Sequence, residues 1–234
     1  MWEGMSDERL RSVTGRIRAA DPSLDVSQRI CLVAREFFDA KSVSLSLVVG
    51  HGYRPIAATD DTGSLLDEEQ FAAGDGPTFW AQNSPTPVIV EDSHGESETA
   101  RWPIFAKLAE RSGIRGTFAF PLRVGEAFLG VLTAYRAHAG APSAEQYAYG
   151  LVLASLATAE LVRREAGIEP GKDGFEPRLY NQSVLQIAAG MVAESLGIQI
   201  FAALARIRAR AFADDQPVSH TAQLIVARKL VLEK

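Results

Sequence analysis

The sequence GTFAFPLRVGEAFLGVLTAY, residues 116–135, decides the fold that we predict for this chain. Residues 116–122 and 128–135 are two apolar runs of strand length, and the residues between them include Gly125. Apolar runs separated by a short segment that contains glycine are typical of neighbouring strands joined by a turn. We therefore predict two paired strands, around which the rest of a sheet should assemble.

Upstream of these strands, the sequence predicts helices and then a second pair of strands. Apolar residues recur at helical spacing over residues 6–40, with an interruption at Asp21-Pro22-Ser23. Residues 43–49 alternate apolar and polar side chains, which is typical of a half-buried strand. Residues 53–59 are its expected partner across the turn Gly50-His51-Gly52.

Shorter elements are expected between the two strand pairs, and a long helix is expected after them. Pro77 suits the first position of a helix, because its fixed φ angle is already helical. Residues 87–90 predict a short strand, and residues 100–112 predict a helix. Residues 143–164 predict a long helix that begins with a capping box, in which side chains satisfy the first free N–H groups.

This order of elements predicts an α+β fold with a mainly antiparallel sheet and flanking helices. Three glycines and two prolines between residues 167 and 177 indicate a linker, and three more helices are expected after it. We divide the chain into an N-terminal helix (1–23), an α+β domain (24–165), a linker (166–177) and a three-helix C-terminal domain (178–234).

Composition places the chain among soluble globular proteins. It has 234 residues, of which 47% are hydrophobic and 23% charged. No apolar run reaches the roughly 18 residues that a membrane helix needs, and the N-terminus lacks the pattern of a secretory signal. Because Cys31 is the single cysteine, no intrachain disulfide can form, and we expect a cytoplasmic setting.

Charge is distributed unevenly along the chain. Residues 1–176 carry 17 Lys and Arg against 25 Asp and Glu, a balance of −8, whereas residues 177–234 carry 7 against 4, a balance of +3. An acidic front and a mildly basic tail favour two units with different partners, although an excess of three positive charges also arises by chance.

The sequence offers no convincing catalytic or metal-binding pattern. The histidines lack the spacing of zinc ligands, and no phosphate-binding loop of the P-loop type is present. Disulfide-exchange chemistry needs more thiols than Cys31 alone. A haem held by one histidine, His94 or His138, leaves no spacing signature and stays open. We therefore predict neither enzyme activity nor a cofactor.

Three segments of the front domain form a recognisable set. They are Gly74-Asp75-Gly76-Pro77, Arg101-Trp102-Pro103-Ile104-Phe105, and Phe118-Ala119-Phe120-Pro121-Leu122-Arg123-Val124-Gly125 followed by Leu129-Gly130-Val131-Leu132. Over about residues 24–164, this set resembles GAF domains, and the actinobacterial type most closely. GAF domains are sensory modules that bind small molecules or dimerise.

The resemblance implies a ligand pocket on one face of the sheet, near residues 74–80 and 89–94. The candidate ligand-binding residues are Asp75, Phe79, Trp80, Val90 and Phe118. The alternative interpretation is that the aromatic side chains fill the core and that the pocket has degenerated into a dimerisation surface.

The tail predicts three helices, over about residues 178–196, 199–213 and 217–232. Gly190 lies inside the first helix, where glycine costs about 1 kcal/mol relative to alanine. A glycine in such a position indicates a close approach by another backbone or by a ligand.

Four segments of the tail fall in order at a characteristic spacing. They are Ala188-x-Gly190-Met191, Leu196-Gly197-Ile198, Ala205-Arg206-Ile207-Arg208-x-x-Ala211-Phe212 and Pro217-Val218-Ser219-x-x-Ala222. They resemble the ANTAR domain, a three-helix RNA-binding module of bacterial antitermination regulators. The resemblance implies a homodimer that binds paired stem-loops with six-base loops in leader transcripts, so that transcription reads through an overlapping terminator.

The same resemblance implies a set of RNA-binding residues, namely Arg178, Ala188, Gly190, Arg206, Arg210, Arg228 and Lys229. Ala188 and Gly190 would let RNA or a neighbouring helix approach the first helix. Arg206 and Arg210 lie one turn apart on the second helix and share a face. The last two residues would extend the basic surface from the third helix.

The tail also departs from the family pattern. Family members often carry Lys or Gln where this chain has Ala189, and basic residues where it has Asn181-Gln182-Ser183. The basic residue expected before Pro217 is Gln216. Each departure removes a possible phosphate contact, so we expect weak RNA binding or an unusual target.

These observations lead to one main hypothesis and several alternatives. We predict a cytoplasmic one-component regulator in which the GAF domain senses a small molecule or a partner, and helix 143–164 with the linker transmits its state to an RNA-binding tail. A DNA-binding transcription factor and a protein-interaction module without nucleic acid are the alternatives. A GAF enzyme is disfavoured by the single cysteine.

Overall fold

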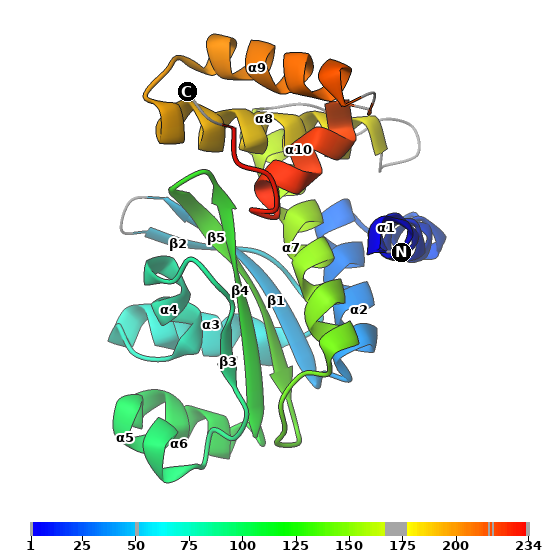
Figure 1. The fold of residues 1–234 in the computed structure, drawn as a ribbon. Coiled ribbons are helices and arrows are strands. Elements are labelled where there is room, and N and C mark those ends of the chain that lie inside the picture. Colours follow the sequence, from blue (N-terminus) through cyan, green and yellow to red (C-terminus); the bar gives the residue numbers. More distant parts are fainter. Residues whose placement is uncertain (1, 50–51, 167–176, 215, 217, 233–234) are drawn as a thin grey trace.

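The computed structural model describes residues 2–49, 52–166, 177–214, 216 and 218–232, so the linker predicted at 166–177 lies almost wholly outside the described residues. Five strands form one antiparallel sheet in the order β2-β1-β5-β4-β3 (Figure 1). The strands are β1 (Ser42–Val49), β2 (Gly52–Ala58), β3 (Val88–Val90), β4 (Gly116–Val124) and β5 (Ala127–Arg136).

Helices cover both faces of the sheet, and three more lie beyond one end of it (Figure 1). One face carries α2 (Val26–Phe38) and α7 (Ala144–Glu165), with α1 (Trp2–Ala19) packed outside them. The other face carries α3 (Asp61–Ala73), α4 (Pro77–Trp80), the short 3-10 helix η1 (Ala81–Asn83), α5 (Glu96–Arg101) and α6 (Pro103–Arg111). The C-terminal helices are α8 (Pro177–Leu196), α9 (Ile200–Ala213) and α10 (Val218–Val226). The predicted α+β fold with three C-terminal helices is confirmed.

The main hydrophobic core lies between the sheet and the layer of α2 and α7. Alternate residues of the three central strands point into it, because successive side chains of a strand face opposite sides. These residues are Val43, Leu45 and Leu47 of β1, Phe118, Phe120 and Leu122 of β4, and Leu132 and Ala134 of β5. Ile30 and Phe38 of α2 and Leu153 and Leu161 of α7 are buried against them.

The predicted capping box of the long helix is confirmed. The Ser143 hydroxyl accepts from the Gln146 backbone N–H, and the Gln146 side chain accepts from the Ser143 backbone N–H, both at 3.0 Å.

The strands β4 and β5 are longer than predicted, and only Gly125 and Glu126 connect them. Gly125 has a φ of +59°, which glycine adopts without a Cβ clash, so this residue allows the tight turn.

Several elements differ from the sequence expectations. Helix α3 was not predicted, and the helix expected over residues 100–112 is divided into α5 and α6 at Pro103. A proline removes a helical hydrogen bond, so a break there follows from its chemistry. The last helix ends at Val226, and Arg228 has a φ of +54°, which a regular helix does not accommodate. Among the described residues, no helix is both long enough and apolar enough to cross a membrane.

The contact between Gly150 and Phe120 provides a test of the core. A Cβ atom at Gly150 of α7 would lie 2.2 and 2.4 Å from two carbons of the Phe120 ring, which is itself buried. We expect Gly150→Ala to destabilise the protein by about 1–3 kcal/mol through overpacking, despite the higher helix propensity of alanine. Chemical denaturation would measure this change. Gly15→Ala in α1 is the matched control, because its Cβ meets no atom within 4 Å, and it should be neutral or stabilising.

Candidate functional site

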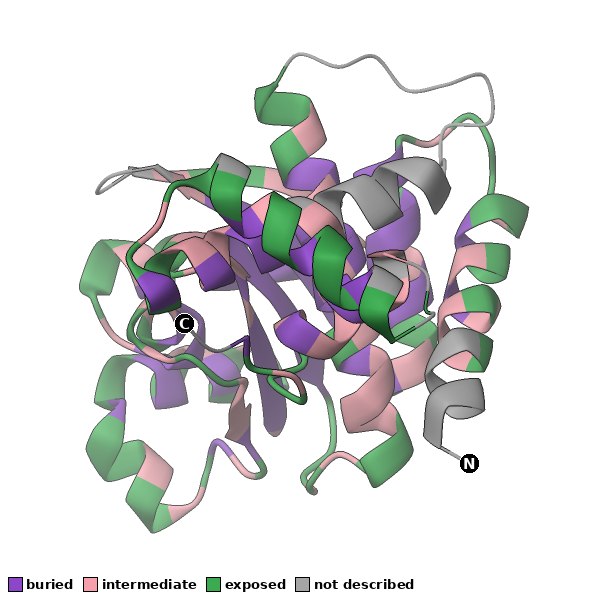
Figure 2. Ribbon diagram, turned by 45° about the horizontal axis from the view of Figure 1, so that its top comes forward, coloured by how far each residue is buried: buried purple, intermediate pink, exposed green. Residues whose placement is uncertain are grey.

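The face of the sheet opposite the main core is lined with hydroxyl groups. Strand registers place Ser42, Tyr135 and Thr117 in one row, and Ser44 and Thr133 in the next. Ser46 of β1 follows on the same side. All six residues are buried, and Figure 2 shows the central strands as buried. The half-buried strand predicted for residues 43–49 is therefore covered on both faces, and α3 packs over its polar side.

A carboxyl group from α3 lies at the centre of this hydroxyl face. Asp67 is completely buried, and its Oδ1 accepts a hydrogen bond of 2.5 Å from the Tyr135 hydroxyl. Its Oδ2 accepts from the Ser46 hydroxyl at 3.2 Å. No described residue forms an ion pair with Asp67. Since an unpaired charge is costly to bury, these hydroxyl donors provide its main compensation.

Gln70 and Thr78 extend the contacts around Tyr135. The Gln70 amide donates to the Tyr135 hydroxyl at 2.8 Å, and its side-chain oxygen accepts from the Thr78 backbone N–H at 2.9 Å. The Thr78 hydroxyl lies 2.9 Å from the Tyr135 hydroxyl and 3.3 Å from the Thr133 hydroxyl. We call Ser46, Asp67, Gln70, Thr78, Thr133 and Tyr135 the Asp67 cluster. It ties α3 and α4 to strands β1 and β5.

Counting the hydrogens that each hydroxyl can donate shows which group is the donor in each contact of the Asp67 cluster. A hydroxyl has one hydrogen to donate, and Tyr135 directs its hydrogen to Asp67. Thr78 must then donate to Tyr135, and Thr133 must donate to Thr78. The Ser46 hydroxyl also lies 3.5 Å from the Val131 carbonyl oxygen, so it has an alternative acceptor. Protonation of Asp67 would add a donor and allow these hydrogens to rearrange.

Burial raises the pKa of Asp67 to about 6, although hydrogen bonds from Tyr135 and Ser46 oppose the shift. The same burial, together with the nearby Asp67 charge, raises the pKa of the Tyr135 hydroxyl. The carboxyl can therefore exchange a proton close to neutral pH, while the phenol stays protonated.

The predicted ligand-binding residues are brought together only in part. Asp75 caps α6, because its carboxyl oxygens accept from the backbone N–H groups of Ile104 and Phe105, both at 3.3 Å. Phe79 packs edge to face on Phe71, with ring centroids 5.8 Å apart. Trp80 is 44% exposed, and the Arg101 guanidinium lies 5.1 Å from its ring centroid. These three candidates lie around α4.

The other two ligand candidates lie in the interior. Val90 is buried in a second apolar cluster with Trp102, Phe105 and Tyr135. Phe118 points to the opposite face of the sheet, where it packs edge to face on Phe38 at 5.9 Å. Phe118 is fully buried on the face that α2 and α7 cover, so the expectation that it shares a pocket with the residues around α4 is corrected.

Sequence reasoning missed the residues at the centre of the site. Asp67 and Gln70 belong to α3, whose buried positions are Gly63, Leu66, Asp67 and Gln70. Their spacing is helical, but only one of the four is strongly apolar, so hydrophobic periodicity does not reveal the helix. The available signal is Asp60, whose carboxyl caps the helix by accepting from the backbone N–H groups of Thr62 and Gly63.

The structure separates the predicted RNA-binding residues into exposed and buried groups. Arg206 and Arg210 of α9 are exposed, and Arg210 pairs with Asp214 at 2.5 Å. Ala188 of α8 is completely buried, so it supports helix packing and does not offer a surface to RNA. Gly190 of α8 is partly buried.

The remaining candidates lie at the two ends of the tail. Arg228 and Lys229 are exposed but follow the end of α10, so the prediction that they lie on the third helix is wrong. Arg178 lies in the first turn of α8, and its side chain is outside the described part of the structure. Among the described side chains of the predicted set, the basic ones that a helix presents to solvent are therefore Arg206 and Arg210 of α9.

Comparison with known proteins bears on the front domain. Residues 23–161 match the family model of the GAF domain. The GAF domain of a phosphoenolpyruvate-protein phosphotransferase from Acinetobacter matches with a TM-score of 0.51 at 13% identity, over 70% of this chain and 96% of that one. The corresponding domain from Coxiella burnetii matches with a TM-score of 0.51 at 19% identity, over 70% of this chain and 97% of that one. These likenesses show the fold. No curated protein matches the chain.

The raised pKa of Asp67 predicts how stability depends on pH. An acid whose pKa is raised by folding from 3.8 to about 6 stabilises the protein when protonated, and this contribution is lost as pH rises through 6. Between pH 5 and pH 7.5, the wild type should lose about 1 kcal/mol from this group. Asp67→Asn should remove that part of the pH dependence in denaturation curves. The exposed neighbour Glu68 provides the control Glu68→Gln. If the unfolding free energies of Asp67→Asn and the wild type changed in parallel with pH, the prediction would be contradicted.

Proposed function

This chain belongs to the GAF domain family, and on that premise we propose that its sensor domain regulates an RNA-binding, three-helix tail in transcription antitermination. The tail is α8, α9 and α10, whose sequence segments resemble the ANTAR domain. The observation that carries this proposal is the basic face of α9. The role is binding and not catalysis, and we expect a homodimer as the functional unit.

The basic face of α9 is defined by Arg206 and Arg210, which lie one turn apart and are exposed. Arg208 is also exposed, but it lies on a different side of the helix. Ala203, Ile207 and Ala211 of the same helix are buried in the tail. Arginine pairs with phosphate oxygens through a planar group of donors, and the α9 arginines lie on the outermost helix (Figure 1). This arrangement suits contacts to the phosphates of a folded RNA, whose loop bases can be read from the single-stranded part.

Gly190 supplies independent support. It lies inside α8, where glycine weakens a helix, yet a Cβ atom built there meets no atom of the described residues within 4 Å. Its φ is not positive, so the backbone does not require glycine either. Such a glycine is typical of a close approach by another backbone or by a ligand. The Gly125 turn of the sensor domain lies beside the Gly190 backbone, and the open space at the Gly190 Cβ position leaves room for an external partner as well.

The Asp67 cluster is the proposed input site of the sensor. It joins two helices to two central strands, so a change in its hydrogen bonds alters how α3 and α4 pack on the sheet. The Thr117 hydroxyl on the same face is buried without a hydrogen-bond partner among the described residues. An unsatisfied buried hydroxyl favours a bound water or a small polar ligand at this face.

Binding of the full chain to a twin hexaloop RNA tests the proposed function. A salt series against a scrambled RNA and a DNA duplex should show selective binding that weakens steeply with salt, because phosphate contacts release counterions. Arg206→Ala/Arg210→Ala should lower the affinity and reduce the slope of log K against log salt by about 1–2.

Lys107→Ala/Arg111→Ala is the matched control, because it removes two exposed cations from α6 of the sensor domain and should leave binding unchanged. Preference for the duplex would support a DNA-binding regulator instead. Absence of salt-sensitive binding to either nucleic acid would favour a protein-interaction module.

Gly190→Ala separates a structural role from a binding role. Because the added Cβ has open space, we expect the free energy of unfolding to rise by about 0.5–1 kcal/mol. If RNA approaches this residue, the same variant should bind the twin hexaloop RNA more weakly. A more stable variant with unchanged RNA affinity would remove Gly190 from the proposed interface.

A further inference from the structure

The outer side of α9 is a ridge of alanines. Ala202, Ala205, Ala209 and Ala213 are exposed, and their spacing of three, four and four residues places them along one face of the helix. Ile207 is two residues from both Ala205 and Ala209, so it lies about 160° from each around the helix axis. It is completely buried in the tail. The four alanines, which we call the alanine ridge, therefore point away from the rest of the tail.

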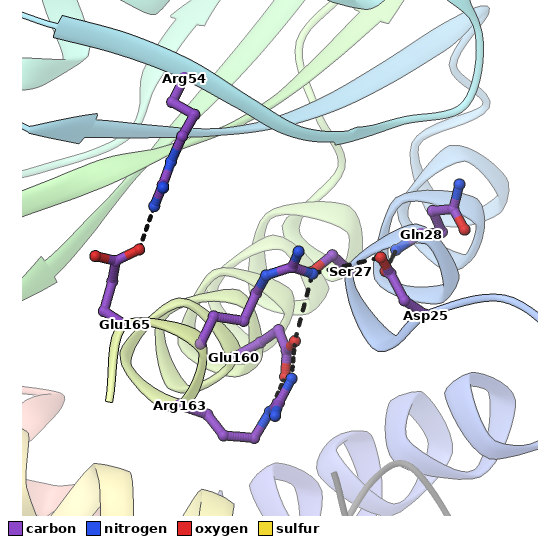
Figure 3. A network of polar contacts seen from close by, with 8 residues as sticks. Asp25, Ser27, Gln28, Arg54, Glu160, Arg163 and Glu165 are labelled. Carbon is purple, nitrogen blue, oxygen red and sulfur yellow. Dashed lines mark hydrogen bonds and ion pairs between the residues drawn. The ribbon is translucent and has the colours of Figure 1, made fainter. Parts of the chain in front are cut away.

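The sensor domain supports the tail from the other side. Helix α8 contacts β4 and α7, and α9 packs on α8 and α10 as the outermost helix (Figure 1). The end of α7 is itself held by ion pairs (Figure 3). Arg54 of β2 pairs with Glu165, and Arg163 donates to Glu160 at 2.7 and 2.8 Å. This packing leaves the alanine ridge exposed on the side of the tail away from the sheet.

Arginines border the alanine ridge on both sides. Arg206 and Arg210 lie one turn apart on one side of it. Arg208 is two residues from each of them, which places it about 160° around the helix axis from both. Ala205 and Ala209 lie between the two sides, and all three arginines are exposed. Helix α9 contains no acidic residue, and Asp214, which pairs with Arg210, follows its end.

A double-stranded stem of RNA offers a surface that matches this face. Its two strands carry phosphates along both sides of each groove, and arginine is well suited to bind phosphate oxygens. The minor groove of A-form RNA is wide and shallow, whereas its major groove is too narrow for side chains to read. Alanine side chains let a helix backbone come close to a shallow surface. They carry no hydrogen-bonding groups, unlike the side chains that read base edges in the major groove of DNA.

We propose that α9 lies along the shallow minor groove of an RNA stem, with Arg206 and Arg210 on the phosphates of one strand and Arg208 on those of the other. The inference rests on the RNA-binding function proposed above. It assigns α9 to the stem and not to the loop bases, so this contact recognises the A-form shape of the stem and not its sequence. It also makes Arg208 a contact residue, although the resemblance to the ANTAR domain implied only Arg206 and Arg210 on this helix.

The variant Arg208→Ala in the full chain tests the two-sided contact. We expect it to bind the twin hexaloop RNA on the order of tenfold more weakly and to reduce the slope of log K against log salt by about 1, because one phosphate contact is lost. The same loss is expected with an RNA that keeps the stems but carries unrelated loops. Arg35→Ala is the matched control, because it removes one exposed arginine from α2 of the sensor domain and should leave binding unchanged.

The variant Ala205→Leu/Ala209→Leu tests the alanine ridge. Leucine is a good helix former and adds bulk without charge, so the helix should persist while its backbone is held away from the groove. We expect binding to weaken on the order of tenfold, as it does when contacts that require close approach are lost. Ala72→Leu/Ala73→Leu is the control, because it enlarges two exposed alanines of α3 and should bind like the wild type.

The outcomes separate failure of the stem contact from failure of RNA binding. If the wild type binds RNA but Arg208→Ala or the leucine variant of α9 binds equally well, the stem contact is overturned and the RNA-binding function stands. A loss confined to RNA with the hexaloops would assign α9 to the loops and would overturn the proposal too. Preference for a DNA duplex of the stem sequence would also contradict it. If the wild type binds no RNA, the proposed function fails and the stem contact fails with it.

Discussion

The constraint on which the structure depends is a sheet that is buried on both faces. One face is filled with aliphatic and aromatic side chains against α2 and α7, and it needs no specific partners. The other face carries hydroxyl groups, and each buried hydroxyl without a hydrogen-bond partner lowers the stability of the fold. Helix α3 meets part of this demand, because Asp67 accepts from Ser46 and Tyr135 and Gln70 donates to Tyr135. Polar contacts therefore help to determine how α3 packs.

This constraint connects stability with sensing. A core stabilised only by apolar contacts would be insensitive to small chemical changes at neutral pH. A buried carboxyl without a cationic partner among the described residues is different, because its proton and its hydrogen-bond donors determine its energy. The same strand, β5, then runs from this carboxyl to the turn at Gly125, which lies beside α8. The sensor domain and the tail share one hydrophobic cluster, so the tail packs directly on the sensor domain.

The parts of the fold that follow hydrophobic pattern could be predicted from the sequence. The paired strands around Gly125, the capping box at Ser143 and the first two tail helices belong to this group. Helix α3 could not be found this way, because Asp67 and Gln70 occupy buried positions where periodicity expects apolar side chains. The side of the sheet toward which Phe118 points could not be predicted either. Phe118, Ala119 and Phe120 are all apolar, so the sequence shows no alternation of apolar and polar residues there. Similarly, α10 ends just before Arg228, which has a positive φ, and an arginine in the sequence does not indicate such a backbone conformation.

A direct measurement of the Asp67 carboxyl decides whether the hydroxyl face is built around an ionisable group. Carbon-13 NMR can follow the side-chain carboxyl resonance of Asp67 as a function of pH, with Asp67→Asn to assign the signal. The structure predicts a titration midpoint of about 6. A midpoint at or below the ordinary value of about 4 would show a solvated or charge-paired carboxyl, and it would contradict this account of the sensor face.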